Sequence, residues 1–215
     1  MTVKNWYSAA ISRLMEHEGE AMIILRHAHR HPITDTLKHE LAMLTDEGKE
    51  CSKTLGSWLA ENGFNITSCM ASPVRRCEET AELILQGYGK DMDIQTVRLL
   101  GNIDPFIDDE EAAEITFRLM HMRDICNGLL DGDVLPGFKD IVSGLKPLVN
   151  DLHSHRWGEL TLVVTHDFFV ASLAGHALGM CFRGEEWIGF VEPMLLLREG
   201  DHTKAWFRGQ EGFLF

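Results

Sequence analysis

Histidines and arginines gather directly behind a short apolar run near the start of the chain. The segment LRHAHRHP, residues 25–32, holds three histidines and two arginines and overlaps the end of the apolar run AMIIL. Two more polar clusters lie at the ends of apolar runs: residues 72–76, Ser72 to Arg76, at the end of FNITSCMAS, and His166-Asp167 after LTLVVT. Guanidinium and imidazole groups together suit an anionic ligand, above all the oxygens of a phosphoryl group.

This set of residue types can do phosphoryl chemistry without a metal. A neutral imidazole can attack phosphorus and carry the phosphoryl group, which splits hydrolysis into two easier steps. An acid must then protonate the leaving oxygen, and Asp167 stands beside a candidate histidine. The alternative is a zinc site at His27, His29 and His31, but zinc also takes carboxylate or thiolate partners. We therefore expect no metal and no other cofactor.

These residues need elements that bring them to one place. AMIIL and LTLVVT are continuous apolar runs, typical of strands buried on both faces in a parallel sheet, and FNITSCMAS and DIQTV are further predicted strands. Helices are predicted over residues 5–17, 46–63, 75–86 and 138–155, the last kinked or shortened at Pro147. The alternation predicts an α/β fold, a three-layer sandwich in which helices flank a mostly parallel central sheet. Ligands bind outside the carboxyl ends of such strands, so the three polar clusters are expected to converge.

One region breaks the alternation. Residues 98–140 contain an acidic loop and a Met-rich helix, which we expect to form a small cap insertion with Leu119, Met120 and Met122 in its core. The 215 residues predict a single domain over 1–215. The closing segment MLLLREGDHTKAWFRG predicts a hairpin.

The composition excludes several classes of partner. With 20 Lys+Arg against 33 Asp+Glu the formal net charge is −13, and this field repels nucleic acid and anionic membranes. An anionic ligand therefore needs a local cationic pocket. No run approaches the 18 apolar residues of a membrane-spanning helix. The five cysteines are scattered without a C-x-x-C pair, and the first residues do not resemble a secretory signal, so a cytoplasmic protein is expected.

Taken together, the motifs resemble those of the histidine phosphatase (phosphoglycerate mutase-like) superfamily. LRHAHRHP resembles the R-H-G opening of the family, and more closely the R-H-G-x-R-x-P of its acid phosphatase branch, with Ala28 in place of the glycine. LTDEG at 44–48 resembles the helix start L-T-x-x-G, and SPVRRCEETAE at 72–82 resembles S-P-x-x-R-x-x-x-T-A-E. VVTHD at 163–167 resembles the strand with the second histidine and the H-D pair of the acid phosphatase branch. A Cβ at Ala28 can alter the turn or narrow the approach to the nucleophile.

The resemblance implies a role for each matching residue. His27 would be the nucleophile that becomes phosphorylated, with Arg26 and Arg76 clamping the phosphoryl oxygens. His166 would donate to the transferred group. Asp167 would protonate the leaving oxygen and then activate water.

The resemblance leaves two details open. Arg30 matches the additional arginine of the acid phosphatase branch and would add phosphate-binding charge. In the mutase-like branch the acid is a glutamate after the second arginine, and this chain has none around Asn102. Asp104 and the acidic run at 108–111 are therefore alternatives to Asp167.

The expected activity is that of a metal-independent phosphoric monoester hydrolase working through phospho-His27, on a small-molecule or protein phosphomonoester. A mutase must protect its phosphoenzyme from water and rebind a second phosphate, and no residues identify that machinery, so a mutase-like phosphotransferase ranks second. The alternative from another class is a catalytically impaired, phosphate-recognising interaction protein. The helix over 5–17 is expected to be a lid or an oligomer contact, the latter in a homodimer.

Overall fold

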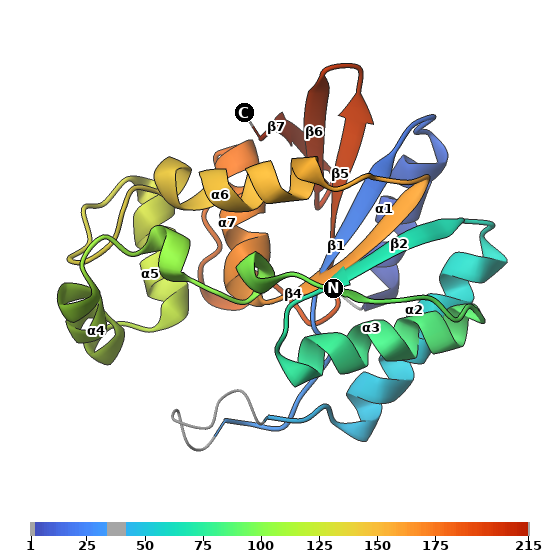
Figure 1. The fold of residues 1–215 in the computed structure, drawn as a ribbon, viewed down its shortest axis with the longest axis horizontal. Coiled ribbons are helices and arrows are strands. Elements are labelled where there is room, and N and C mark those ends of the chain that lie inside the picture. The colour runs from blue at the N-terminus through green and yellow to red at the C-terminus, as the bar shows by residue number, and fades with distance from the viewer. Residues whose placement is uncertain (1–2, 34–41, 215) are drawn as a thin grey trace.

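A central sheet organises the computed structural model, which describes residues 3–33 and 42–214 (Figure 1). Within these residues seven strands lie in the order β3-β2-β4-β1-β5-β6-β7. The strands are β1 (Ala21–Arg26), β2 (Ile66–Ala71), β3 (Gln95–Thr96), β4 (Leu160–Thr165), β5 (Pro193–Glu199), β6 (His202–Phe207) and β7 (Gln210–Phe213). Strands β1 to β4 pair in parallel, whereas β5, β6 and β7 continue the sheet from β1 as antiparallel strands.

Helices cover both faces of this sheet, which confirms the predicted α/β sandwich. The helices are α1 (Val3–Met15), α2 (Asp46–Glu61), α3 (Arg75–Tyr88), α4 (Glu110–Leu119), α5 (Met122–Asp131), α6 (Ile141–Ser154) and α7 (Asp167–Leu178). Side chains of α1, α2 and α3 form one buried apolar cluster with one face of the sheet, and those of α5, α6 and α7 form a second with the other face. The sheet is thus the middle of three layers.

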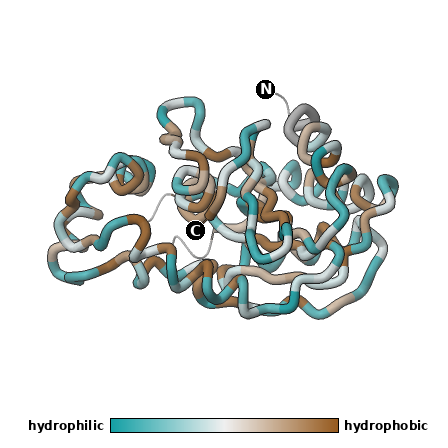
Figure 2. The backbone as a smooth tube through the Cα atoms, turned by 90° about the horizontal axis from the view of Figure 1, so that it is seen from above, coloured by the Kyte–Doolittle hydropathy of each residue, from teal (hydrophilic) through white to brown (hydrophobic). Residues whose placement is uncertain are grey.

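The helical layers on both sides of β1 explain why its residues are apolar from Ala21 to Leu25. Met22 and Ile24 pack into the cluster on the α6 and α7 side, whereas Ile23 and Leu25 pack into the cluster on the α1 to α3 side, and all four are fully buried. Alternate side chains of a strand point to opposite faces, so a strand with a helical layer on each side needs apolar residues throughout. Figure 2, in which each residue is coloured by its hydropathy, shows stretches of hydrophobic residues in the middle of the part formed by the sheet and its helices.

Helices α2 and α3 pack backbone to backbone. The hydroxyl of Thr45 accepts a hydrogen bond from the Gly48 amide and so caps α2, as the threonine before this helix leads one to expect. A Cβ added at Gly56 would lie 1.9 Å from the Ile84 carbonyl oxygen, and one at Gly87 would lie 2.0 Å from that of Lys53. The two glycines therefore set how closely α3 approaches α2.

Some local predictions differ from the structure. The predicted helix near Met120 is two helices, α4 and α5, and Leu119 (79% exposed) and Met122 (39% exposed) lie outside the core that they were expected to form. Helix α6 runs through Pro147 without being shortened, and the third predicted strand is reduced to the two residues of β3. Over residues 3–33 and 42–214, no helix combines the length and apolar character required to cross a membrane.

Candidate active site

Three parallel strands end at one edge of the sheet, and polar residues follow each of them. The His27 amide donates to the Thr165 carbonyl at 2.8 Å, and the Ser72 amide donates to the Val164 carbonyl at 2.9 Å. These two bonds continue the β1–β4 and β2–β4 pairing one residue beyond the strands. His27, Ser72 and His166 therefore meet where the sheet ends, as the sequence analysis expects of the three clusters.

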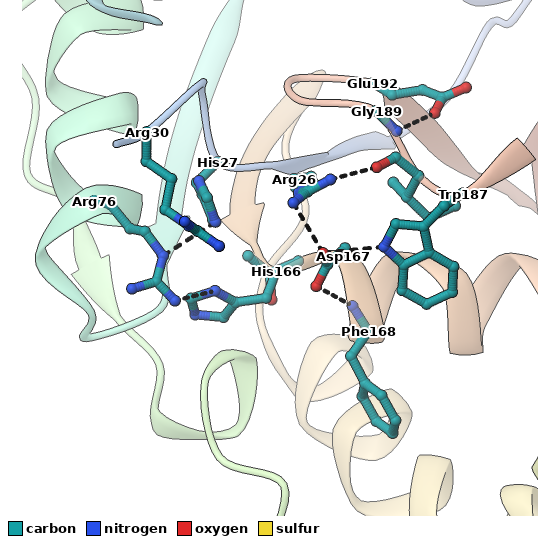
Figure 3. A network of polar contacts seen from close by, with 12 residues as sticks. Arg26, His27, Arg30, Arg76, His166, Asp167, Phe168, Trp187, Gly189 and Glu192 are labelled. Atoms are coloured by element: carbon teal, nitrogen blue, oxygen red, sulfur yellow. Dashed lines mark hydrogen bonds and ion pairs between the residues drawn. The ribbon is translucent and has the colours of Figure 1, made fainter. Parts of the chain in front are cut away.

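His27 is buried, and its two ring nitrogens have different partners. Nδ1 lies 2.8 Å from the Ala28 carbonyl oxygen, while Nε2 lies 3.0 Å from the Arg76 Nε (Figure 3). Because a carbonyl only accepts and a guanidinium only donates, Nδ1 carries the proton and Nε2 presents its lone pair. Burial lowers the pKa of His27 well below its usual value, and the neighbouring His166, Arg76 and Arg26 lower it further, although the hydrogen bond to the Ala28 carbonyl opposes this change. The ring is therefore neutral near pH 7, with Nε2 available as a nucleophile.

His166 stands opposite, with the two imidazole rings 5.5 Å apart. Its Nδ1 lies 3.1 Å from the Arg76 Nη2, and its Nε2 lies 3.0 Å from the Ser72 hydroxyl oxygen. Nδ1 therefore accepts, and the Nε2–H donates to Ser72. The Cys77 thiol lies 3.5 Å from Nε2, and burial raises the pKa of this thiol to about 12, so it is a neutral neighbour and not a competing nucleophile.

Arg26 is held on several sides. Its Nη1 donates to the Ile188 carbonyl at 2.6 Å, its Nη2 lies 2.9 Å from the Asp167 Oδ2, and its Cζ lies 4.0 Å from the centre of the Phe190 ring. Nε is buried and has no hydrogen-bond partner within the described residues. Leaving this buried N–H without an acceptor costs free energy.

The guanidinium groups crowd one another. Burial lowers the pKa of Arg26, and the like charges of Arg30 and Arg76 lower it further, although Asp167 opposes this change. Arg30 points toward His27 and Arg76 in Figure 3. Its Nη1 donates to the His31 carbonyl, while its Nε is buried without a hydrogen-bond partner among residues 3–33 and 42–214. A pocket of like charges is relieved when an anion binds.

Asp167 is the first residue of α7 and accepts hydrogen bonds at both oxygens. Its Oδ2 receives the Arg26 Nη2 and, at 3.1 Å, the Trp187 indole N–H, while its Oδ1 receives the Phe168 amide at 2.9 Å. The structure thus brings Asp167 to the same edge as His27, Arg26, Arg30, Arg76 and His166 (Figure 3).

The alternative acids lie in other settings. Asp104 is exposed and accepts from the Asn102 side-chain amide at 2.8 Å, and Asp109 caps α4 through the Ala112 amide. Gly101 lies against Ser72, since a Cβ added there would come within 2.3 Å of the serine hydroxyl. The segment that contains Asp104 therefore passes close to His166 and its serine partner.

Four residues hold the site in ways that the sequence did not predict. Ser72 binds His166, Thr80 accepts the Ala28 amide at 3.0 Å, and Trp187 and Phe190 contact Asp167 and Arg26. Ser72 and Thr80 stand inside the S-P-x-x-R-x-x-x-T-A-E match, which was the signal that could have found them. Trp187 and Phe190 belong to no recognisable pattern.

The histidines next to His27 do not converge with it. The His29 Nδ1 lies 2.9 Å from the Thr45 hydroxyl, its ring packs edge-on against Phe190 at 4.9 Å, and His31 is exposed. In the part of the chain that the structure describes, no group of three His, Cys, Asp or Glu side chains has an arrangement that could hold a metal ion.

Solved structures share this fold. A mycobacterial glucosyl-3-phosphoglycerate phosphatase in complex with VO3 aligns with a TM-score of 0.58 at 16% identity, over 88% of this chain and 99% of that one. A putative alpha-ribazole-5'-P phosphatase from Escherichia coli aligns with a TM-score of 0.57 at 16% identity, over 90% and 97% of the two chains. At these identities the likeness establishes the fold.

Curated relatives match over a shorter stretch. The mitochondrial serine/threonine-protein phosphatases Pgam5 of Drosophila pseudoobscura pseudoobscura and Drosophila persimilis are each 30% identical over 82 residues. The match covers 38% of this chain and 28% of each fly protein, so the chain matches under a third of the length of these relatives.

A family model extends over most of the chain. The model that describes the histidine phosphatase superfamily (branch 1) matches residues 22–190, which include the four parallel strands apart from Ala21, and Trp187. The match begins at the strand before His27 and ends at Phe190, the residue whose ring lies against Arg26. The chain belongs to the histidine phosphatase superfamily.

Proposed function

We propose that this protein is a metal-independent phosphatase that hydrolyses a phosphomonoester through a phosphohistidine on His27. The observation that carries the proposal is the environment of His27. Its Nδ1–H is bound to the Ala28 carbonyl, and its Nε2 lone pair faces the Arg76 guanidinium. A neutral imidazole whose unprotonated nitrogen faces a cation can attack an anionic phosphoryl group once the Arg76 N–H turns from Nε2 to a phosphoryl oxygen.

In the first step Nε2 of His27 attacks phosphorus while the bond from phosphorus to the ester oxygen breaks. The negative charge of the equatorial oxygens is stabilised by Arg26, Arg30 and Arg76, which act as fixed cationic donors. His166 is placed to donate to the same oxygens once it is protonated. The leaving oxygen takes a proton and departs as an alcohol.

Asp167 is the proposed acid, and the acidic residues at 104–111 are the alternative. Asp167 gives up its ion pair with Arg26 as it takes up a proton, and it then donates this proton to the ester oxygen. In the second step it accepts a proton from water as the water oxygen attacks the phosphohistidine. This releases inorganic phosphate and restores neutral His27.

The relatives support this class of reaction. Pgam5 is named a serine/threonine-protein phosphatase, and the mycobacterial structure is named a glucosyl-3-phosphoglycerate phosphatase. These names cover a protein and a small-molecule phosphomonoester, so we propose the reaction class and leave the substrate as either kind. The R-H-x-x-R-x-P and H-D matches favour an acid like that of the acid phosphatase branch.

The first experiment measures hydrolysis of para-nitrophenyl phosphate with EDTA present, for wild type, His27→Ala and a remote exposed control, His202→Ala. We expect turnover in wild type and control and none in His27→Ala. We also expect a labelled phosphoenzyme in a rapid alkaline quench, because phosphohistidine is stable to alkali and labile to acid. Turnover that does not depend on His27 contradicts the mechanism. Phosphate binding without turnover would instead support the impaired, phosphate-recognising alternative.

A leaving-group series identifies the acid. Asp167→Asn and Asp104→Asn are compared on aryl phosphates whose phenol pKa values differ. Loss of the general acid slows poor leaving groups far more than good ones, because a good leaving group departs without a proton. We expect this steeper dependence in Asp167→Asn only. The same steepening in Asp104→Asn alone would transfer the role to Asp104.

A further inference from the structure

One loop forms a wall of the proposed phosphate pocket and contacts two of its charged residues. The Ile188 carbonyl accepts from Arg26, and the Phe190 ring lies beneath the same guanidinium. The Trp187 indole N–H donates to Asp167 (Figure 3). The position of residues 187–192, which we call the wall loop, therefore fixes where Arg26 and Asp167 point.

The wall loop has little regular structure of its own. It follows a short 3₁₀ helix at Gly184–Glu186 and precedes β5. Val191 has a φ of 52°, a conformation that is strained for a β-branched residue and persists only where its surroundings enforce it. Its amide donates to the Arg26 carbonyl, and its carbonyl accepts from the Tyr7 hydroxyl.

Glu192 anchors the loop from the inside. Its side chain is 1% exposed, and its Oε2 accepts from the Gly189 amide at 2.7 Å. Arg208 binds the same carboxylate with two donors, Nε to Oε1 at 2.6 Å and Nη2 to Oε2 at 2.8 Å. This is the bidentate geometry in which an arginine–carboxylate pair is strongest and most directional.

Arg208 reaches the loop from a distant part of the chain. It stands at the turn between β6 and β7, with a φ of 51°. Its Nη1 donates to the Glu186 carbonyl at 2.7 Å and its Nη2 to the Trp187 carbonyl, so one guanidinium holds residues at the start and at the end of the wall loop. The rings of Phe207 and Phe182 lie 4.9 and 5.6 Å from its Cζ.

We infer that Glu192 and Arg208 are positioning residues for catalysis, and that their ion pair holds the wall loop so that Arg26 and Asp167 stand ready in the phosphate pocket. The inference rests on the proposed function. A buried ion pair contributes little net stability, but it imposes a defined geometry. Among the described residues, no hydrogen bond or ion pair joins either side chain to Arg26 or Asp167. Arg208 therefore acts through the wall loop, whereas the charge of Glu192 also raises the pKa of Arg26 directly.

The test compares Arg208→Lys with a matched control, Arg198→Lys. Arg198 also pairs with a glutamate, Glu20, and also lies over an aromatic ring, 4.5 Å from the centre of Trp157. Its partner Glu20 precedes β1, at the end of the sheet opposite the site. A lysine at either position keeps the charge and removes the bidentate fork.

Three quantities are measured on each folded variant: amide hydrogen exchange of residues 187–192, orthovanadate affinity, and kcat and KM for para-nitrophenyl phosphate. We expect Arg208→Lys to exchange faster in the wall loop, and to lose on the order of tenfold in vanadate affinity and in kcat, because small misplacements of pocket groups are costly. Glu192→Gln should show the same three changes as Arg208→Lys. Arg198→Lys should match wild type in all three quantities, whatever its thermal stability.

Two outcomes overturn the inference. One is wild-type exchange and vanadate affinity in both Arg208→Lys and Glu192→Gln, which would leave the pair a purely structural role. The other is an equal loss in Arg198→Lys, which would make the effect general destabilisation. If wild type neither binds vanadate nor turns over substrate, the proposed function fails. The exchange comparison then still decides whether Arg208 holds the loop.

Discussion

Arg76 sets the protonation pattern of both site histidines. Its guanidinium reaches the His27 Nε2 and the His166 Nδ1, and because it can only donate, both nitrogens must accept. The protons then lie on the far nitrogens, where the Ala28 carbonyl and the Ser72 hydroxyl receive them. One buried arginine therefore orients the proposed nucleophile and its partner histidine together.

The first prediction concerns Ser72, which receives the His166 Nε2–H. Ser72→Ala removes this acceptor and leaves the imidazole free to change tautomer or to turn, so we expect kcat to fall on the order of tenfold, equal to about 1.4 kcal/mol in activation free energy. Steady-state kinetics at several pH values measures it. Ser57→Ala is the control, since Ser57 donates to the Gly87 carbonyl away from the site. Equal kinetics in the two variants would exclude the role of Ser72.

The second prediction follows from the lowered pKa of His27. The unfolded chain, with a histidine pKa of about 6.5, takes up a proton before the folded protein does as pH falls. The free energy of unfolding therefore decreases as pH falls from about 6.5 to the folded-state pKa, and His27 adds no pH dependence above this window. His27→Gln should remove this decrease.

Urea unfolding between pH 4.5 and 7.5 measures the effect, with wild type, His27→Gln and the exposed control His202→Gln compared at each pH. The difference in unfolding free energy between wild type and His27→Gln should change with pH below about 6.5 and be constant above it. A constant difference at every pH would show that His27 titrates alike in the folded and unfolded chain.

At the scale of secondary-structure elements, the sequence best predicts the buried strands and the positions of the residues that directly follow them. Strands β1 and β4 are buried on both faces, so each is one apolar run, and the residues directly after them had to lie at the edge where the sheet ends. This geometry allowed His27 and His166 to be placed near each other from sequence alone. Ser72 and Arg76 follow from β2 in the same way.

The wall loop and the break between α4 and α5 have no periodic hydropathy pattern in the sequence. The wall loop contacts Arg26 across more than 160 positions, and nothing in its composition distinguishes Trp187 or Phe190 from ordinary core residues. The apolar residues Leu119 and Met122 suggested a core, but they face outward while Ile125 and Leu129 of α5 are buried. Side-chain direction at the break between two short helices is set by tertiary packing, which hydropathy alone does not reveal.

The third prediction tests the glycine contact between α2 and α3. Gly56→Ala places a methyl group 1.9 Å from the Ile84 carbonyl oxygen, so the helices must separate. We expect a loss of about 1–3 kcal/mol in unfolding free energy, as for other overpacked cores. Because α3 contains Arg76, we also expect weaker phosphate binding. Urea unfolding and phosphate titration measure both, with the exposed Glu50→Ala on α2 as the control. Unchanged stability in Gly56→Ala would mean that the helices adjust freely.

The whole molecule combines a strongly acidic surface with a local cationic pocket. The formal net charge is −13, yet Arg26, Arg30 and Arg76 gather at one edge of the sheet, where Asp167 is the carboxylate ion-paired with Arg26. Burial lowers the pKa of Arg26, and the like charges of Arg30 and Arg76 lower it further. Folding therefore gathers like charges that Asp167 offsets in part and that a bound anion would offset further.

The fourth prediction is that a tetrahedral oxyanion stabilises the entire fold. A ligand that binds only the folded state adds about 2.7 kcal/mol when present at 100 times its dissociation constant. For a chain of this size that corresponds to a rise of roughly 5–10 °C in Tm. Differential scanning fluorimetry with orthovanadate, against sodium chloride at equal ionic strength, measures the rise. Arg76→Lys should abolish most of it, since a lysine cannot reach both histidines with a planar fork. An equal rise in Tm with chloride, or an equal rise with orthovanadate in Arg76→Lys, would contradict binding in the pocket. The salt would then act on the acidic surface, because screening of surface charge does not depend on Arg76.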